Sequence, residues 1–137
     1  MKLTAEDKML IKEAENISAK SSRVNLAHTS DNSAALITSK GNIFRGVCLG
    51  FSCGIGSCGE YQAVGSMISN GEKYIKTIVA VHYENKKYKV IPPCGKCREM
   101  LHQLSKKSGD TEVIISSSKK VKLKELIPHG WDHTIEK

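Results

Sequence analysis

Three cysteines and one glutamate in two short stretches of the chain have the types and spacing of a catalytic metal site. Cys94 and Cys97 form a Cys-x-x-Cys pair, the spacing with which two thiolates bind one Zn²⁺. Cys58 supplies a third thiol, and three protein ligands leave the fourth tetrahedral position of zinc open for water. Glu60 follows two residues later, close enough to reach that water without binding the metal. The two stretches therefore predict a zinc centre for hydrolytic chemistry.

The reactivity of such a centre depends on the charge of its ligands. Three thiolates on Zn²⁺ leave a net charge of −1, which weakens the Lewis acidity of the metal. We expect Cys58 and the Cys94–Cys97 pair to lie at the starts of two helices, where partial positive charge and free N–H groups favour thiolate. Arg98 is expected to donate hydrogen bonds to a ligand sulfur without contacting the metal itself.

The alternative is a structural zinc closed by a fourth cysteine, either Cys48 or Cys53. A Cys53-x4-Cys58 pair is compatible with zinc, but it would leave Glu60 without a purpose. Free cysteines otherwise behave as small buried hydrophobic residues. The catalytic interpretation is favoured.

The elements that would position these residues alternate between helix and strand, and the whole chain, 1–137, is expected to form one domain. Thr4, with Asp7 three residues on, predicts the start of a first helix. The expected helices are 4–20, 58–69 and 94–107, the strands are 33–38, 42–51, 77–81 and 112–116, and 121–127 is a short strand and helical turn. Residues 21–32 are expected to be a loop and 83–90 to be mobile. This order predicts a three-layer α/β/α sandwich around a mixed sheet.

Composition narrows the choice of partners. The formal net charge is +7, from 21 basic and 14 acidic side chains, which favours a polyanionic partner. The lysines are nevertheless dispersed in groups that we expect in turns or on solvated faces, such as Lys86–Lys89 and Lys119–Lys124, and aromatic side chains are scarce. No apolar run is long enough to span a bilayer and no secretory signal is readable, so the chain is expected to be cytoplasmic.

The two metal-site stretches resemble the cytidine deaminase superfamily. Cys58-Gly59-Glu60 followed by Pro93-Cys94-Gly95-Lys96-Cys97-Arg98 is similar to the family pattern Cys-Ala-Glu, then Pro-Cys-x-x-Cys. Ser33-Ala34-Ala35-Leu36 with Gly41–Val47 is similar to the family's opening hairpin, and Glu125-Leu126-Ile127-Pro128 to its usual ending. The resemblance implies a five-stranded mixed sheet between helices, a homotetramer and Zn²⁺ held by the three cysteines. It also implies Glu60 as proton shuttle in the deamination of a small aminopyrimidine nucleoside.

Two departures from the cytidine deaminase pattern bear on the substrate. Cytidine deaminases hold the ribose with an Asn-x-Glu motif on the second strand, where this chain has Val47-Cys48-Leu49-Gly50. They also follow the catalytic glutamate with arginine, and here the residue is Tyr61. The blasticidin S deaminase branch likewise lacks that glutamate and that arginine, and its Leu-Leu-Pro-Ser-Gly-Tyr run resembles Leu126–Trp131. The expected substrate is therefore cytidine, deoxycytidine or a blasticidin S-like analogue.

Several further residues are candidates for substrate contact. His28 and Asn32 lie just before the strand 33–38, where the family places such residues, although loop solvation also explains them. Phe51 either walls the pocket or belongs to the core. Trp131 either stacks on the base as a lid or packs the C-terminal segment, and its neighbours His129 and His133 could also be ligands of a second metal. His82 is expected to satisfy a local hydrogen bond.

The alternative function uses the basic surface. The chain would then be a zinc-stabilised nucleic-acid-binding module, or an RNA or DNA cytosine deaminase. We find no order of charged residues that builds a positive groove leading to the pocket, so nucleic acid is the less favoured partner.

Overall fold

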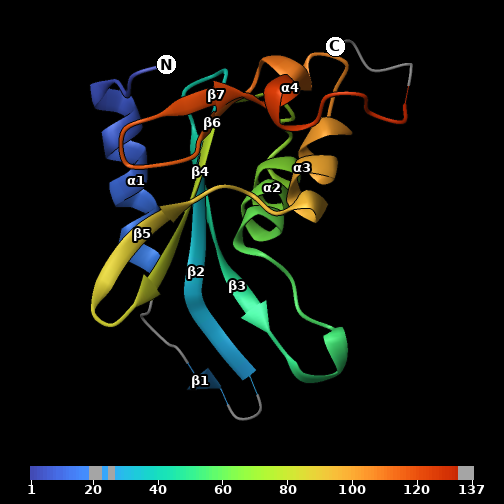
Figure 1. Cartoon of the computed structure of the whole chain (residues 1–137). Coiled ribbons are helices and arrows are strands. Elements are labelled where there is room, and N and C mark those ends of the chain that lie inside the picture. Colours follow the sequence, from blue (N-terminus) through green and yellow to red (C-terminus); the bar gives the residue numbers. More distant parts are fainter. Residues whose placement is uncertain (19–22, 25–26, 133–137) are drawn as a thin grey trace.

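A mixed β-sheet forms the centre of the molecule in a computed structural model, which describes residues 1–18, 23–24 and 27–132 (Figure 1). Its strands are β1 (Arg23–Val24), β2 (Ala27–Thr38), β3 (Ile43–Gly50), β4 (Ile75–Glu84), β5 (Lys87–Ile91), β6 (Glu112–Ile114) and β7 (Lys120–Lys122). Five of them lie in the order β3-β2-β4-β6-β7, while β1 pairs with the start of β2 and β5 with the end of β4. The β4–β6 pair is parallel and the others are antiparallel. The expected five-stranded mixed sheet is confirmed, with two short additions.

Helices cover both faces of this sheet, which gives the three layers that the sequence predicted (Figure 1). Helix α1 (Ala5–Ile17) lies on one face, and α2 (Gly59–Ser69), α3 (Gly95–His102) and the short α4 (Leu123–Leu126) lie on the other. Strand alternation divides the core accordingly: Ala35 and Ile37 of β2 pack toward α1, whereas Leu36 packs toward α2. None of the helices in the described part of the chain is both long and apolar enough to cross a bilayer.

The start of α1 forms as the sequence predicted. The Thr4 side chain accepts from the Asp7 N–H at 3.2 Å, and Asp7 accepts from the Thr4 N–H at 2.8 Å, which completes a capping box. Asp7 also binds Lys120 of β7, with 2.8 Å between Nζ and Oδ2. Lys120 was expected on a solvated face, and this was wrong: its side chain is 7% exposed, because Asp7 and Glu112 together neutralise it.

Three segment predictions were wrong. Residues 27–32, expected as loop, extend β2, because their backbone pairs with β1, β3 and β4, beyond the helices (Figure 1). Residues 83–90, expected to be mobile, form the β4–β5 hairpin, whose turn has positive φ at Asn85 (51°) and Lys86 (61°). Helix α3 ends at His102, earlier than predicted.

Candidate metal centre

The two helix starts predicted to carry the thiols are those of α2 and α3. Cys58 is the N-cap residue of α2, Cys94 is the N-cap residue of α3, and Cys97 lies in the first turn of α3. The three sulfur atoms lie within 4.8 Å of one another. Zn–S bonds of about 2.3 Å in a tetrahedral site place sulfurs about 3.8 Å apart, so a small contraction would complete the geometry. The donor set fits Zn²⁺ with one position left open.

The three thiols differ in acidity. Backbone N–H groups of Cys97 and Lys96 donate to Cys94, and they hold the pKa of that thiol below its ordinary value. Burial and the nearby charge of Glu60 raise the pKa of both Cys58 and Cys97. These pKa shifts agree with the expected effect of the helix start at Cys94, whereas burial opposes that effect at Cys58 and Cys97. A metal would have to displace protons from these thiols.

Glu60 lies in the first turn of α2 and is almost fully buried, with 8% of its surface exposed. Together with Ala80 of β4 and Pro93 before α3, it lines a cavity of about 10 Å³. This is close to the volume that one water molecule needs. The fold thus places a carboxylate between the two thiol-bearing segments, as the spacing from Cys58 predicted.

Two glycines allow α2 to approach the sheet closely enough for this placement. A Cβ on Gly46 of β3 would lie 2.5 Å from the Ala63 nitrogen and 2.6 Å from the Gly59 oxygen. A Cβ on Gly59 would lie 2.9 Å from the Gly46 oxygen. The start of α2, which carries both Cys58 and Glu60, is therefore fixed by backbone-to-backbone packing against β3.

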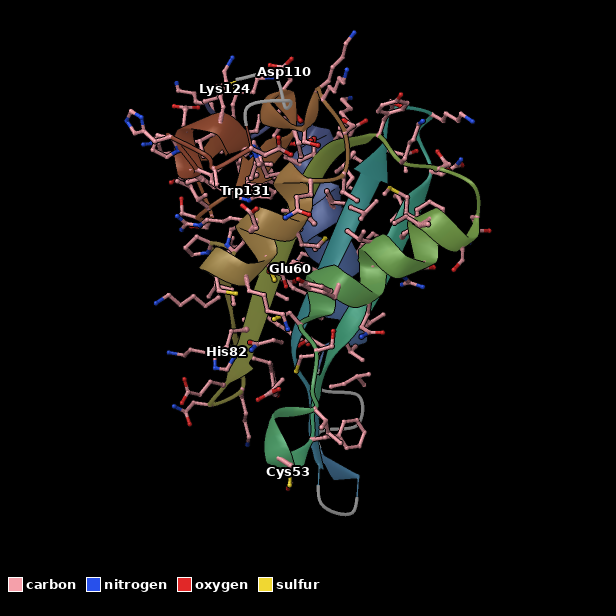
Figure 2. All side chains as sticks on the ribbon, turned by 90° about the vertical axis from the view of Figure 1, so that its right-hand side faces the viewer. Cys53, Glu60, His82, Asp110, Lys124 and Trp131 are labelled. Atoms are coloured by element: carbon pink, nitrogen blue, oxygen red, sulfur yellow. The ribbon has the colours of Figure 1, made fainter. Side chains whose placement is uncertain are left out.

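The other two cysteines lie outside the group of three. Cys48 on β3 donates to Oδ1 of Asp31 at a sulfur–oxygen distance of 2.9 Å. Cys53 is exposed on the loop after β3, far below Glu60 in Figure 2. The structure therefore gives no support to a structural zinc closed by either of them as fourth ligand.

Arg98 lies next to the site, but its side chain donates hydrogen bonds to backbone carbonyl groups and not to a ligand sulfur. Its Nε donates to the Pro93 carbonyl at 2.8 Å and its Nη1 to the Leu126 carbonyl at 3.2 Å. The expected hydrogen bond to a ligand sulfur was wrong, because the side chain turns toward α4. Arg98 instead fixes the peptide immediately before Cys94.

Asn32, one of the predicted substrate contacts, lies on β2 and pairs with His82 of β4. Its Oδ1 lies 2.5 Å from Nδ1 of His82, which confirms the local hydrogen bond expected for that histidine. The backbone of His28 pairs with Gly50 on β3, while its side chain lies outside the described features. Phe51 is 43% exposed at the start of the loop after β3, so it does not belong to the core.

Trp131 packs on the outer side of α3. Its Nε1 donates to Oε1 of Glu99, and 68% of the residue is exposed (Figure 2). This contact supports the interpretation that Trp131 attaches the C-terminal segment to its own fold, against that of a lid on the base. His129 is exposed with φ of 59°, and His133 lies outside the described residues.

A cavity of about 800 Å³ lies away from the thiols. It is bordered by Tyr74 at the start of β4, by the segment after α3 and by five lysines: Lys73, Lys76, Lys106, Lys107 and Lys122. No thiol and no histidine lines this cavity, so the size of a cavity does not by itself identify the active site. The group of three cysteines with Glu60 remains the candidate site.

A curated relative, blasticidin-S deaminase from Bacillus cereus, is 36% identical to this chain, and the match covers 69% of the chain and 72% of the relative. The chain belongs to the blasticidin-S deaminase family, within the cytidine deaminase superfamily. Solved cytidine deaminases share the fold. The one from Mycobacterium tuberculosis has a TM-score of 0.77 at 21% identity, covering 94% of this chain and 99% of its own. The one from Burkholderia pseudomallei has a TM-score of 0.73 at 22% identity, covering 94% and 100%. No family model matches the chain.

Membership of the cytidine deaminase superfamily confirms the resemblance drawn from Cys58, Glu60 and the Cys94–Cys97 pair. The sequence did not point to Asp31, however, which lies beside Cys48 on the face of the sheet that carries the site. No local signal marks this residue, because its position results from a bulge in the pairing of β2 with β3.

Proposed function

We propose that the chain is a zinc-dependent hydrolytic deaminase of a cytosine-type nucleoside or nucleoside analogue. The observation that carries this proposal is the set of three thiols within 4.8 Å of one another, at two helix starts, with the buried Glu60 beside them. The substrate class rests on the named activities of the blasticidin-S deaminase relative and of the cytidine deaminases that share the fold.

The proposed reaction exchanges the exocyclic amine at C4 of the pyrimidine for the oxygen of water and releases ammonia. Zn²⁺ held by Cys58, Cys94 and Cys97 would lower the pKa of a bound water toward 7. The Glu60 carboxylate takes one proton from the attacking water and delivers it to the ring nitrogen. It then transfers the second proton of that water to the amine, which leaves as ammonia. Because Glu60 is buried, its carboxylate meets the substrate and little bulk water. The Cys94 thiol, whose pKa is lowered, is the one most readily deprotonated for metal binding.

Glu60→Gln tests this mechanism. The amide keeps the size of the side chain but cannot accept the proton, so we expect kcat on the preferred nucleoside to fall about 10³-fold or more while one zinc per chain is retained. A panel of aminated nucleosides followed by loss of absorbance, together with metal analysis, gives both readouts.

Glu13→Gln is the matched control for Glu60→Gln. Glu13 lies on α1, on the opposite face of the sheet, where it binds Arg45, and its replacement should leave kcat unchanged. A Glu60→Gln protein that turns over as fast as the parent would rule out the proposed proton shuttle.

The nucleic-acid alternative has less support, because part of the basic surface is engaged within the molecule. Lys76 binds Glu6 at 2.6 Å, and Lys120 is buried between Asp7 and Glu112. The homotetramer expected from the resemblance stays a prediction.

Salt dependence separates the two functions. We expect kcat/KM on a free nucleoside to change less than about twofold between 50 and 200 mM salt, since no phosphate is bound. Binding to single-stranded RNA through several lysines would weaken at least about tenfold over the same range. Tight, strongly salt-dependent RNA binding without nucleoside turnover would favour the nucleic-acid-binding module.

A further inference from the structure

A strip of the sheet that no helix covers lies directly beyond the start of α2 (Figure 1). It includes Asp31 and Asn32 of β2 and Cys48 of β3. Gly59, the first residue of α2, rests on β2 and β3: a Cβ there would lie 3.1 Å from Cα of Ser33 and 2.9 Å from the Gly46 oxygen. Past these contacts β2 and β3 continue beyond the helical layer (Figure 1). Side chains that point to this face therefore border the start of α2 without a helix above them.

Cys48 is the residue of β3 that connects this strip with the metal centre. Side chains alternate along a strand, so Cys48 points to the same face as Gly46, which packs against α2. The next residue, Leu49, pairs with Ser57 through two backbone hydrogen bonds of 2.8 Å. Since Ser57 immediately precedes Cys58, Cys48 and Cys58 occupy neighbouring positions across this bridge. The strip next to Cys48 is thus adjacent to the three thiols.

A bulge in β2 brings a carboxylate to Cys48. Thr29 pairs with Leu49 and Ser33 pairs with Val47, so three residues of β2 face the single residue Cys48 on β3. Bulges of this kind redirect side chains and are frequent beside active sites. Here the bulge places Oδ1 of Asp31 within 2.9 Å of the Cys48 sulfur. Among the residues that the structure describes, Oδ2 of Asp31 has no hydrogen-bond partner.

The residue that follows Asp31 extends this polar strip to the next strand. Asn32 pairs with His82 of β4 in register, and its amide oxygen accepts from Nδ1 of that ring. Nε2 of His82 lies 3.4 Å from Oε2 of Glu84. The Asn32 side chain is thereby held in one orientation, one residue from Asp31.

We propose that Asp31 binds the sugar hydroxyl groups of the nucleoside, with Cys48 as the residue that positions its carboxylate. This rests on the proposed function and names the part of the substrate that the strip recognises. A half-buried carboxylate with one oxygen held by a thiol is suited to accept hydrogen bonds from hydroxyl groups. The neighbouring stretch Val47–Gly50 of β3 contains no carboxylate or amide side chain. Asp31 of β2 is therefore the acid beside this part of β3.

Binding measurements on the zinc-loaded Glu60→Gln protein test the role of Asp31, because bound nucleoside is then not consumed. The probes are cytidine and 2′,3′-dideoxycytidine, which share the base and differ in two hydroxyl groups. We expect cytidine to bind about 10- to 100-fold more tightly. Adding Asp31→Asn should weaken the binding of cytidine by a similar factor and leave the affinity for 2′,3′-dideoxycytidine unchanged. Cys48→Ala should produce a smaller loss, and Cys48→Ser, which keeps a donor, should restore binding.

Asp110→Asn is the matched control. Asp110 is exposed at the far end of the molecule from Cys53, beside Lys124, and its replacement should leave the affinity for both nucleosides unchanged (Figure 2). An Asp31→Asn variant that weakens both nucleosides equally, or neither, would overturn the inference. If the parent protein deaminates cytidine in that case, the proposed function still stands. A parent protein that deaminates no compound of the aminated-nucleoside panel would overturn both.

Discussion

At the scale of single residues, the structure separates cysteines that the sequence left as alternatives. Cys97 is fully buried and lies with Cys58 and Cys94 in one group, whereas Cys53 is exposed on the loop after β3. Residue type and spacing could not make this distinction, because a Cys-x4-Cys pair is also compatible with zinc. The distances between sulfur atoms favour Cys58, Cys94 and Cys97 as the proposed ligands.

Metal content should therefore respond very differently to two cysteine-to-serine changes. Cys97→Ser removes one of the three proposed ligands, and we expect zinc binding to weaken by at least about 100-fold, with loss of turnover. Cys53→Ser should retain one zinc per chain and full activity, since Cys53 is outside the group. Competition with a chromogenic chelator measures both. Equal zinc loss in the two variants would contradict the ligand assignment.

At the scale of elements, the contact between α2 and β3 determines where the chemistry can occur. Cys58 and Glu60 are both fixed by the first turn of α2, and that turn lies against the backbone of Gly46. A displacement of α2 by the width of one methyl group would move Cys58 and Glu60 together. Reacting groups must be held within fractions of an ångström, so this packing matters for rate as well as stability.

Two glycine-to-alanine changes test this packing. In Gly46→Ala, the added Cβ would lie 2.5 Å from the Ala63 nitrogen, so we expect a loss of about 2 kcal/mol in unfolding free energy and a fall in kcat of at least about 10-fold. In Gly65→Ala on the same helix, nothing lies within 4 Å, and we expect a gain of about 0.5–1 kcal/mol with unchanged kcat. Chemical denaturation and steady-state kinetics measure these effects. Unchanged kcat in Gly46→Ala would show that the contact does not position the site.

At the scale of the whole molecule, a buried ion pair joins the first helix to the last strand. Asp7 is 2% exposed and binds Lys120, which also binds Glu112 of β6. Burial raises the pKa of Asp7, but the hydrogen bonds from Lys120 and Thr4 outweigh it, and the pKa lies below 3.8. Burial likewise lowers the pKa of Lys120, but Asp7 and Glu112 together raise it above 10.5. The network therefore stabilises the fold at pH values between about 3.8 and 10.5.

Asp7→Asn should lower the unfolding free energy by about 3 kcal/mol at pH 7, because it leaves Lys120 buried with one fewer acid. Since the folded pKa of Asp7 is depressed, this contribution is present above about pH 4 and is lost as the pH falls further. The difference between parent and variant should accordingly be constant from pH 5 to 9 and shrink below pH 4. Denaturation curves at several pH values measure it.

The exposed pair Glu6–Lys76 provides the control for Asp7→Asn. Its side chains are 39% and 54% exposed, and Glu6→Gln should cost less than about 1 kcal/mol at any pH. A loss in Asp7→Asn no larger than that in Glu6→Gln would contradict the stabilising role of the buried pair.

Local sequence patterns predicted much of the fold and the candidate site. The spacing of Cys58, Glu60 and the Cys94–Cys97 pair indicated the metal centre, and Thr4 with Asp7 predicted the start of α1. These features depend on neighbours within a few residues, and hydrogen bonding and helix geometry act over that range. The strand alternation that divides the core between α1 and α2 is of the same kind.

Tertiary structure alone decided the features that depend on distant partners. Lys120 is buried only because Asp7 and Glu112 lie beside it, and burial and the charge of Glu60 raise the pKa of the Cys97 thiol. The bulge in β2 brings Asp31 to Cys48 across a strand pair. Burial and charge are sums over residues far apart in the chain. The sequence therefore determined the candidate ligands and the candidate acid, while the packing determined which thiols meet, how acidic they are and which other groups lie beside them.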